Sequence, residues 1–263
     1  MPEYDATVTR TVKKAMDILD CLGEENHPLA VSEIGHRLGM PRSTVYRLLN
    51  TLAVTGYVTQ DSAEPQKYRL GFKVLELASR FLGSIELRRM ALPFLEELRN
   101  LVNETVHLVV PDGGQVAYVE KVECSQAVRM HSTVGSRVFM HCTAVGKALL
   151  AFMTPEEVEA IVTRHGLPAR TPNTITDRAK LFKHLEEVRR RGYAIDNVEN
   201  EDGIRCVGAP IFDHQGRPVA ALSVSGPAFR LTLDRVQELI EPVRVTAQRI
   251  SRELGSRGEE HKR

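Results

Sequence analysis

Apolar residues at the start of the chain are spaced as in three short helices. Those of the first helix recur every three or four positions, at Val12, Ala15, Met16, Leu19 and Leu22. Gly23 follows them as a stop signal. Ser32 is expected to cap a second helix that ends at Gly39. Pro41 suits the first position of a third helix, because its missing N–H has no intrahelical partner there.

The predicted third helix has two unlike faces. Its apolar stripe consists of Val45, Leu48, Leu49 and Leu52. The residues largely off this stripe are Arg42, Ser43, Tyr46, Arg47 and Asn50. A short helix, a turn with glycine, and a helix whose N-terminal half is polar and basic together indicate a helix-turn-helix. In such a motif the second helix enters the major groove of DNA.

The pattern after this helix predicts a β-hairpin. Tyr57 and Val58 belong to one strand, Tyr68 and Leu70 to the other, and residues 62–65 form a polar turn. A hairpin directly after the recognition helix makes the motif a winged helix. Between positions 37 and 73 there are six Lys or Arg against two acidic residues, although the whole chain has a net charge of only +1. The basic charge is therefore concentrated where DNA would bind.

The remainder of the chain mixes helical and strand patterns. Helices are expected at residues 72–82, 86–102, 143–152, 155–164, 177–191 and 231–255. Strands are expected at residues 105–110, 115–122, 127–132, 193–197, 206–213 and 218–226. The turn signals PDGG and HQGR each separate two neighbouring strands. This order predicts an α+β domain around an antiparallel sheet rather than a βαβ series, and no internal repeat is visible.

Length and composition restrict the class of protein further. A chain of 263 residues suits two domains. No apolar run reaches the roughly 20 residues that span a bilayer, and the N-terminus lacks the apolar core of a signal peptide. A cytoplasmic protein without a membrane partner is therefore expected. The four cysteines are widely spaced, which predicts free buried thiols and neither a disulfide framework nor a zinc ribbon.

Several long motifs resemble those of the IclR family of bacterial transcription regulators, from about Val8 to Gly255. They are SEIGHRLGMPRSTVYRLLNTLAVTGYV with KYRLG, HCTAVGKALLA, RGYAIDNVENEDGIRCVGAPIFD and AALSVSGP. The resemblance implies an N-terminal winged helix-turn-helix, a GAF-like sensor domain, dimers or dimers of dimers, and a metabolite that changes operator binding. We expect a DNA-binding domain, a linker helix, an effector-binding domain and a disordered tail, at residues 1–71, 72–85, 86–255 and 256–263.

The residues that would touch DNA follow from the chemistry of the duplex. Arginine and lysine neutralise phosphates, and side chains near the start of the recognition helix reach base edges. The expected contacts of the third helix are Arg42, Ser43, Thr44, Tyr46 and Arg47. In the wing, Lys67 and Arg69 are expected to contact phosphates. The alternative is a solvated helix face on a small protein-binding module.

A candidate anion site lies in the segment SRVFMHCTAVGKALL, residues 136–150, where a polar loop ends and a helix begins. Free backbone N–H groups and the helix dipole favour an anion at such a point, and a carboxylate is the expected guest. The residues concerned are Cys142, Thr143, Ala144, Val145 and Gly146. The alternative is an ordinary capped helix packed on the sheet.

Other segments match the family's effector pocket residue by residue. The resemblance places Asp196, Cys206, Ser223 and Ser225 in this pocket, and Ala127 and Met130 at its lining positions. The two serines are two positions apart in a strand and share one face. An ionised Asp196 would repel a carboxylate, so it is expected to accept hydrogen bonds from ligand hydroxyls. A carboxylate and hydroxyls on one ligand predict a hydroxy acid or a sugar acid.

The sequence favours neither metal binding nor catalysis. His131, His141, Cys142 and Cys206 lack metal-ligand spacing, so no metal and no cofactor is expected. A Cys142 nucleophile with His141 as base is disfavoured, because adjacent strand residues point apart. The sequence predicts a homo-oligomeric repressor that binds double-stranded operator DNA and senses a small carboxylate, and not an enzyme. The alternatives are a metabolite-binding enzyme with a winged-helix appendage and a protein-interaction adaptor.

Overall fold

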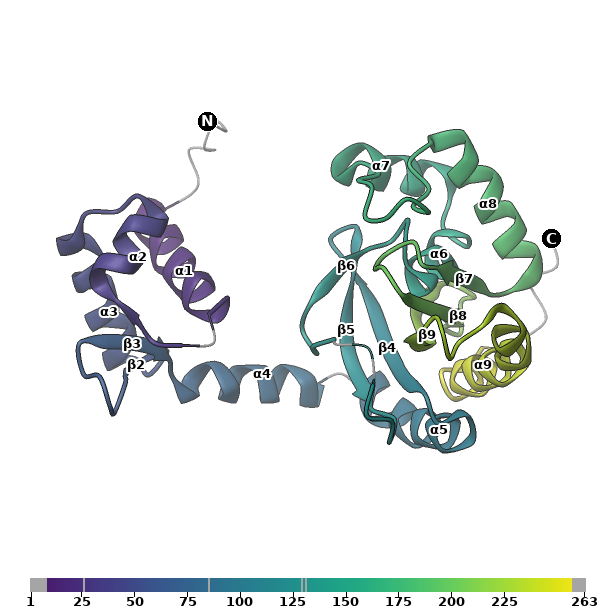
Figure 1. Cartoon of the computed structure of the whole chain (residues 1–263), viewed down its shortest axis with the longest axis horizontal. Coiled ribbons are helices and arrows are strands. Elements are labelled where there is room, and N and C mark those ends of the chain that lie inside the picture. The colour runs from purple at the N-terminus through teal and green to yellow at the C-terminus, as the bar shows by residue number, and fades with distance from the viewer. Residues whose placement is uncertain (1–8, 26, 85, 129, 131, 257–263) are drawn as a thin grey trace. The chain divides into compact units, whose positions relative to one another are not determined.

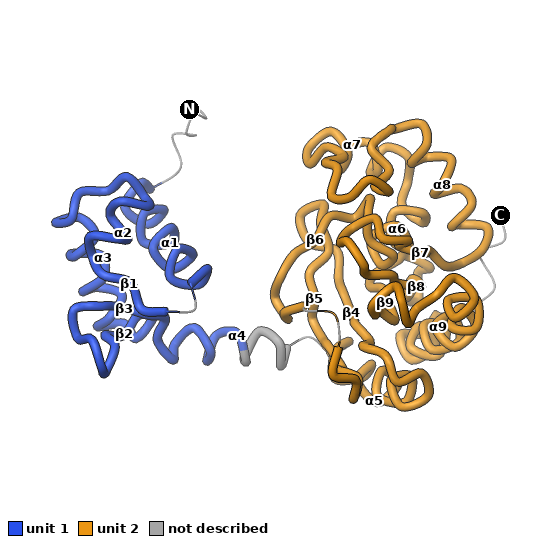
Figure 2. The backbone as a smooth tube through the Cα atoms, viewed as in Figure 1, with its two compact units in different colours: residues 1–84 blue, residues 85–263 orange. Residues whose placement is uncertain are grey.

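The chain forms two compact units, residues 1–84 and residues 85–263 (Figure 2). The computed structural model describes residues 9–25, 27–84, 86–128, 130 and 132–256. Of the tail predicted to be disordered, residues 257–263 lie outside the described residues. Each unit has its own hydrophobic core.

The first unit is a helix-turn-helix with a small sheet (Figure 1). Its elements are α1 (Arg10–Gly23), β1 (Leu29–Ala30), α2 (Val31–Leu38), α3 (Arg42–Val54), β2 (Val58–Gln60), β3 (Lys67–Leu70) and α4 (Phe72–Ser84). The strand order is β1-β3-β2, so the hairpin β2–β3 is the predicted wing. Ile18, Ile34 and Leu49 are fully buried between the helices and fix α3 by its apolar stripe.

The start of α2 differs from the prediction. Ser32 was expected as the N-cap, but the helix begins at Val31 and Ala30 occupies the cap position. The prediction was wrong because pairing with β3 holds Ala30 extended in the short strand β1, which no local signal announced. The Glu33 carboxylate accepts a hydrogen bond from the Ala30 N–H at 2.6 Å, so the helix is capped from its own first turn.

Two smaller expectations in this unit also need correction. Pro41 is the N-cap residue of α3 rather than its first helical residue, with extended backbone at ψ 139°. In α1, Val12 and Met16 are 56% and 49% exposed although the apolar pattern placed them on the buried stripe. The core contacts only the C-terminal half of α1, through Ile18 and Leu22.

The second unit is a six-stranded antiparallel sheet with helices on both faces (Figure 1). Its helices are α5 (Glu86–Val102), α6 (Ala144–Leu150), α7 (Pro155–His165), α8 (Arg178–Arg191) and α9 (Leu233–Glu253). Its strands are β4 (Thr105–Asp112), β5 (Gln115–Val122), β6 (Arg137–Phe139), β7 (Ala194–Asn197), β8 (Ile204–Phe212) and β9 (Pro218–Pro227). The order is β6-β5-β4-β9-β8-β7. One core lies under α5 and α9 and the other under α6, α7 and α8, which confirms the predicted α+β class.

The strand expected at residues 127–132 was wrong. The described residues of this segment are irregular, and residues 129 and 131 lie outside the described part of the chain. The edge strand is instead β6, which pairs with residues 115–117 of β5. The alternation in AVRMHS satisfies a strand pattern, but a strand also needs a partner, and residues 137–139 occupy that edge of β5.

The short helix α6 is the element that matters most for the candidate effector site. It was expected over residues 143–152 but has seven residues, because Thr143 caps it and residues 151–153 form a turn.

The predicted capping box of α7 is confirmed: Thr154 Oγ1 accepts from the Glu157 N–H, and the Glu157 carboxylate accepts from the Thr154 N–H.

Candidate functional site

The outer face of α3 presents its polar residues to solvent. Arg42, Ser43, Tyr46 and Arg47 are exposed, whereas Thr44 is half-buried. The guanidinium groups of Arg42 and Arg47 have no hydrogen-bond or ion-pair partner among the described residues. Both groups are thus available to phosphates or to the acceptors of a guanine edge.

The wing is less free to contribute charge than the sequence suggested. Lys67 Nζ lies 2.7 Å from Glu64, and Arg69 Nη1 lies 3.6 Å from Asp61. The backbone N–H groups of Glu64 and Ala63, and then the cations of the wing, lower the pKa of Asp61. Phosphates that contact Lys67 and Arg69 must compete with these carboxylates, so within the recognition helix and the wing the unpaired positive charge lies on α3.

In the second unit, strand pairing brings the predicted effector residues into one row. Asp196 of β7 faces Cys206 of β8, which faces Ser225 of β9, which faces Thr105 of β4. Directly opposed residues in antiparallel strands point to the same face of a sheet. Ser223 is two positions from Ser225, and their hydroxyl oxygens are 3.4 Å apart. The structure therefore brings four of the predicted residues together although they come from three strands.

The start of α6 lies directly against this row. A Cβ at Gly208, which pairs with Ser223, would be 3.2 Å from the Val145 N atom. A Cβ at Gly146 would be 2.3 Å from the Met140 backbone, so only glycine permits the close approach. Thr143 Oγ1 accepts from the Gly146 N–H at 3.2 Å. The backbone N–H groups that precede Gly146 in α6 have no intrahelical acceptor, because none exists at the start of a helix. The helix is capped, as the alternative interpretation required, and it also lies beside the polar row.

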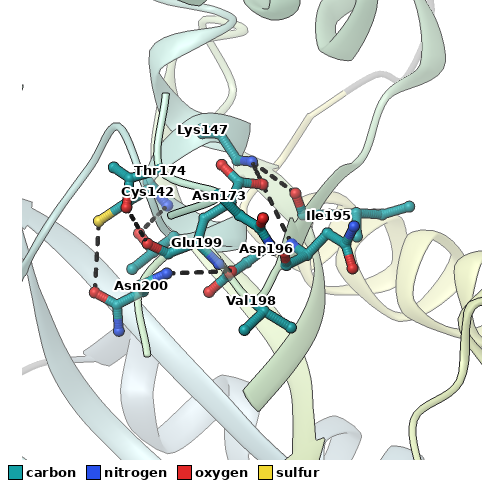
Figure 3. A network of polar contacts seen from close by, with 12 residues as sticks. Cys142, Lys147, Asn173, Thr174, Ile195, Asp196, Val198, Glu199 and Asn200 are labelled. Atoms are coloured by element: carbon teal, nitrogen blue, oxygen red, sulfur yellow. Dashed lines mark hydrogen bonds and ion pairs between the residues drawn. The ribbon is translucent and has the colours of Figure 1, made fainter. Parts of the chain in front are cut away.

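A buried polar network holds the end of β7 (Figure 3). The fully buried Lys147 donates from Nζ to the Glu199 carboxylate and, at 2.7 Å, to the Ile195 carbonyl. Asp196 Oδ1 accepts from the N–H of Glu199 at 2.6 Å and of Asn200 at 3.4 Å. Burial raises the pKa of Asp196 to about 7, and the backbone N–H groups and Lys147 offset only part of that effect. The carboxyl group can therefore be neutral and donate a hydrogen bond near neutral pH, an option that the sequence argument did not include.

Cys142 is a protonated thiol in this environment. Burial, and then the charges of Asp196 and Glu199, raise its pKa to about 12, and its Sγ lies 3.5 Å from Asn200 Oδ1. Burial and Asp196 also raise the pKa of Cys206. All four cysteines are free and buried, as predicted. A thiolate nucleophile at Cys142 is disfavoured by this chemistry.

Two buried residues beside the row were missed by sequence reasoning. His107 pairs with Ser223 across the sheet, is fully buried, and approaches Ser132 Oγ at 2.8 Å through Nε2. Burial lowers its pKa to about 3, so the ring is neutral, and its Nδ1 has no partner within the described residues. The Tyr118 ring lies 5.0 Å from that of His107. The strand pattern located both residues in strands, but only the register shows that His107 shares a face with the serines.

The remaining predicted positions have less definite surroundings. Ala127 is exposed and Met130 is buried, and both lie in the irregular segment between β5 and β6. Ser132 joins this segment to His107. Among the described residues no group of three metal-ligating side chains occurs, and His131 lies outside them.

The raised pKa of Asp196 predicts a pH-dependent stability. A folded-state pKa near 7 lies above the value of about 3.9 in an unfolded chain, so the folded protein holds a proton that the unfolded chain releases. The contribution of Asp196 is therefore full below about pH 4 and is lost as the pH rises through 7. Relative to Asp196→Asn, the wild-type free energy of unfolding should fall by at least about 1.4 kcal/mol over this range, the equivalent of one pKa unit.

Urea unfolding of both proteins between pH 4 and 8, followed by circular dichroism, checks this expectation. His107 and His184 have lowered pKa values and lose stability in the opposite direction, as the pH falls, but they are common to both proteins. The contribution of these histidines therefore cancels when the free energy of unfolding of the variant is subtracted from that of the wild type. Parallel stability curves for the two proteins would contradict the assigned role of Asp196.

An exposed basic helix in a winged helix-turn-helix and a buried polar face in a second domain define a class of protein: DNA-binding regulators with a ligand-binding domain. Two family models match this chain, the IclR helix-turn-helix domain over residues 11–62 and the C-terminal domain of bacterial IclR transcriptional regulators over residues 79–252. The chain belongs to the IclR family of transcriptional regulators, as the resemblance predicted. None of its described helices is long and apolar enough to cross a membrane.

Relatives from three bacteria extend this comparison. The transcriptional regulator KdgR of Escherichia coli is 38% identical over 93% of this chain and 92% of its own length. The transcriptional repressor AllR of Salmonella paratyphi A is 37% identical over 94% and 90%. The crystal structure of an IclR homologue from Microbacterium hydrocarbonoxydans, complexed with 4-hydroxybenzoate, has a TM-score of 0.81 and 29% identity over 93% of this chain and 98% of that one. KdgR and AllR are named as transcriptional regulators and not as enzymes.

Proposed function

We propose that this chain is a cytoplasmic homo-oligomeric repressor whose affinity for operator DNA changes when a small organic acid binds in its second unit. Residues 1–71 would bind DNA, residues 72–85 would link the domains, and residues 86–255 would bind the effector. The similarity to AllR, which is named a repressor, supports the direction of regulation.

The DNA half of the proposal rests on α3. The apolar stripe of α3 is buried in the core of the first unit, so the opposite, polar face of the helix is held toward solvent. Arg42 and Arg47 supply charge without internal partners, and Ser43 and Tyr46 are exposed beside them. A two-fold dimer would place two such helices in successive major grooves, so the half-sites of the operator should lie about 34 Å, or a multiple of it, apart.

The effector half rests on one observation, the buried row of Asp196, Cys206 and Ser225 with Ser223 beside it and the first amides of α6 above Gly208. Backbone N–H groups and hydroxyls can donate to a carboxylate, while Asp196 can pair with a ligand hydroxyl. A hydroxy acid or a sugar acid carries both groups. The relative in complex with 4-hydroxybenzoate, a hydroxyl and a carboxylate on one ring, supports this class.

Thermal unfolding of the full chain against a panel of hydroxy acids and sugar acids tests the effector site. A ligand at 100 times its Kd should add roughly 2.7 kcal/mol to the free energy of unfolding. The double variant Ser223→Ala with Ser225→Ala should lose that stabilisation, because the ligand loses two hydroxyl partners. Ser62→Ala removes an exposed hydroxyl from the other unit and should keep it.

The same ligands should then be added to the chain bound to its operator. A change in operator affinity that the serine variant lacks would support the regulator. A panel without any stabilising acid, or equal stabilisation of the serine variant, would contradict the effector assignment. Turnover of a stabilising acid would favour the enzyme alternative.

A further inference from the structure

A cavity of about 610 Å³ lies in the second unit between the C-terminal end of α8, strand β8 and α9. Its described lining contains five arginines and no acidic side chain: Arg189, Arg190, Arg191, Arg244 and Arg252. The whole chain has a net charge of only +1, so this is a strong local excess of positive charge. None of these residues belongs to the Asp196 row or to α3.

Three of the five arginines are engaged inside the fold. Arg189 donates to the carbonyl groups of Ala151 and Met153. Arg191 donates to the Glu187 carboxylate, and Arg244 to the Glu241 carboxylate. The guanidinium groups of Arg190 and Arg252 are exposed and have no partner in the part of the chain that the structure describes. Two arginines with uncompensated guanidinium groups therefore belong to the lining of one cavity.

Helix dipoles do not account for this arrangement by themselves. Arg190 and Arg252 lie in the last turns of α8 and α9, where the partial negative charge of a helix end favours cations. Each helix end supplies roughly half a charge, so both together offset only about one of the two free cations. Like charges that share a cavity repel one another, and a bound anion would relieve that repulsion.

The volume of the cavity and its apolar lining residues indicate the kind of anion. Planar guanidinium groups bind phosphate oxygens through paired hydrogen bonds. A cavity of 610 Å³ lies within the usual range for small-molecule sites, and is larger than a bare phosphate requires. Phe152 and Phe212, whose rings meet edge to face at 5.0 Å, add an apolar wall. Guanidinium groups beside an apolar wall suit a ligand that carries both a phosphate and an organic part, which is a phosphorylated organic molecule.

We propose that this arginine cavity is a second ligand site, which binds a small phosphorylated metabolite. It is connected to the Asp196 row by two rigid elements. The first amides of α6 lie above Gly208, while the residue after its last turn, Ala151, accepts from Arg189. Strand β8 carries Cys206 in the row and Phe212 at the cavity. A phosphorylated ligand held by the arginines would thus contact strand β8 at its other end, and Phe152 in the turn that follows α6.

Equilibrium dialysis of the full chain with labelled pyrophosphate and with glucose 6-phosphate, at about 0.1 M NaCl, measures the site directly. Both probes should bind with Kd below about 1 mM. Arg190→Gln with Arg252→Gln should weaken binding at least tenfold, and it should leave the fold intact because neither guanidinium has an internal partner. Arg164→Gln removes an exposed charge on α7 outside the cavity and should change Kd less than twofold.

A second control separates this cavity from the DNA-binding face. Arg42→Ala with Arg47→Ala removes the free cations of α3 and should leave the binding of both probes unchanged. Absence of binding to the wild type at about 1 mM probe would overturn the proposal, because a site with Kd below that concentration is at least half occupied. Equal weakening by the Arg164 variant, or loss of binding in the α3 variant, would overturn it as well.

Discussion

Replacing Arg42 and Arg47 together by alanine should lower the affinity for operator DNA at least about 30-fold. Each arginine that contacts a base edge or phosphate contributes roughly 1–3 kcal/mol, and neither guanidinium has an internal partner whose loss would disturb the fold. The slope of log K against log salt should also become less steep by about two units if both contact phosphates. Electrophoretic mobility shift or fluorescence anisotropy at three salt concentrations measures both quantities.

Lys183→Ala is the matched control for this experiment, because it removes an exposed positive charge from α8 in the other unit. Its operator affinity and salt slope should match those of the wild type. Unchanged affinity of the Arg42 and Arg47 variant would favour the protein-interaction adaptor, in which this helix face contacts no DNA. Equal loss in both variants would indicate a general effect of net charge.

Lys147→Met should destabilise the second unit by about 3–5 kcal/mol, the usual cost when a buried ion pair loses one partner. The substitution keeps an unbranched side chain of similar length but leaves the Glu199 carboxylate, only 8% exposed, without its cation. The Ile195 carbonyl would also lose its donor. Urea unfolding of the full chain, followed by circular dichroism, would detect the loss as an earlier transition of this unit.

Two further variants make this expectation specific. Lys147→Met combined with Glu199→Leu removes both charges and should recover much of the lost stability, because no charge remains buried. Lys180→Met, at an exposed position of α8, should change stability by less than about 0.5 kcal/mol. If the double variant were as unstable as the single one, packing and not charge would explain the effect.

The candidate site could be predicted from sequence only in part. The resemblance to a family supplied Asp196, Cys206, Ser223 and Ser225, and the strand period placed the two serines on one face. The role of Lys147 was not predicted, because a lysine in a helix is ordinarily solvated and nothing local indicates that Glu199 lies beside it. His107 was missed for the same reason, since its partner strand β9 follows more than a hundred residues later.

The sequence by itself determined the elements and the class of protein. Apolar periodicity, caps and turn residues act within a few positions, so the helix-turn-helix, the wing and the five described helices of the second unit could be located from them. The errors occurred where a distant partner decided the outcome. Ala30 is held extended by β3, and residues 137–139 rather than 127–132 form the edge strand beside β5.

Only the tertiary structure decided which side chains meet. Strand order and register depend on pairing between segments far apart in the chain, and they placed Asp196 in line with Ser225 and His107 opposite Ser223. Burial then changed the chemistry of these groups, because removal from water is the largest cause of the raised pKa of Asp196. The arginine cavity likewise requires α8 and α9 to end beside the same strand.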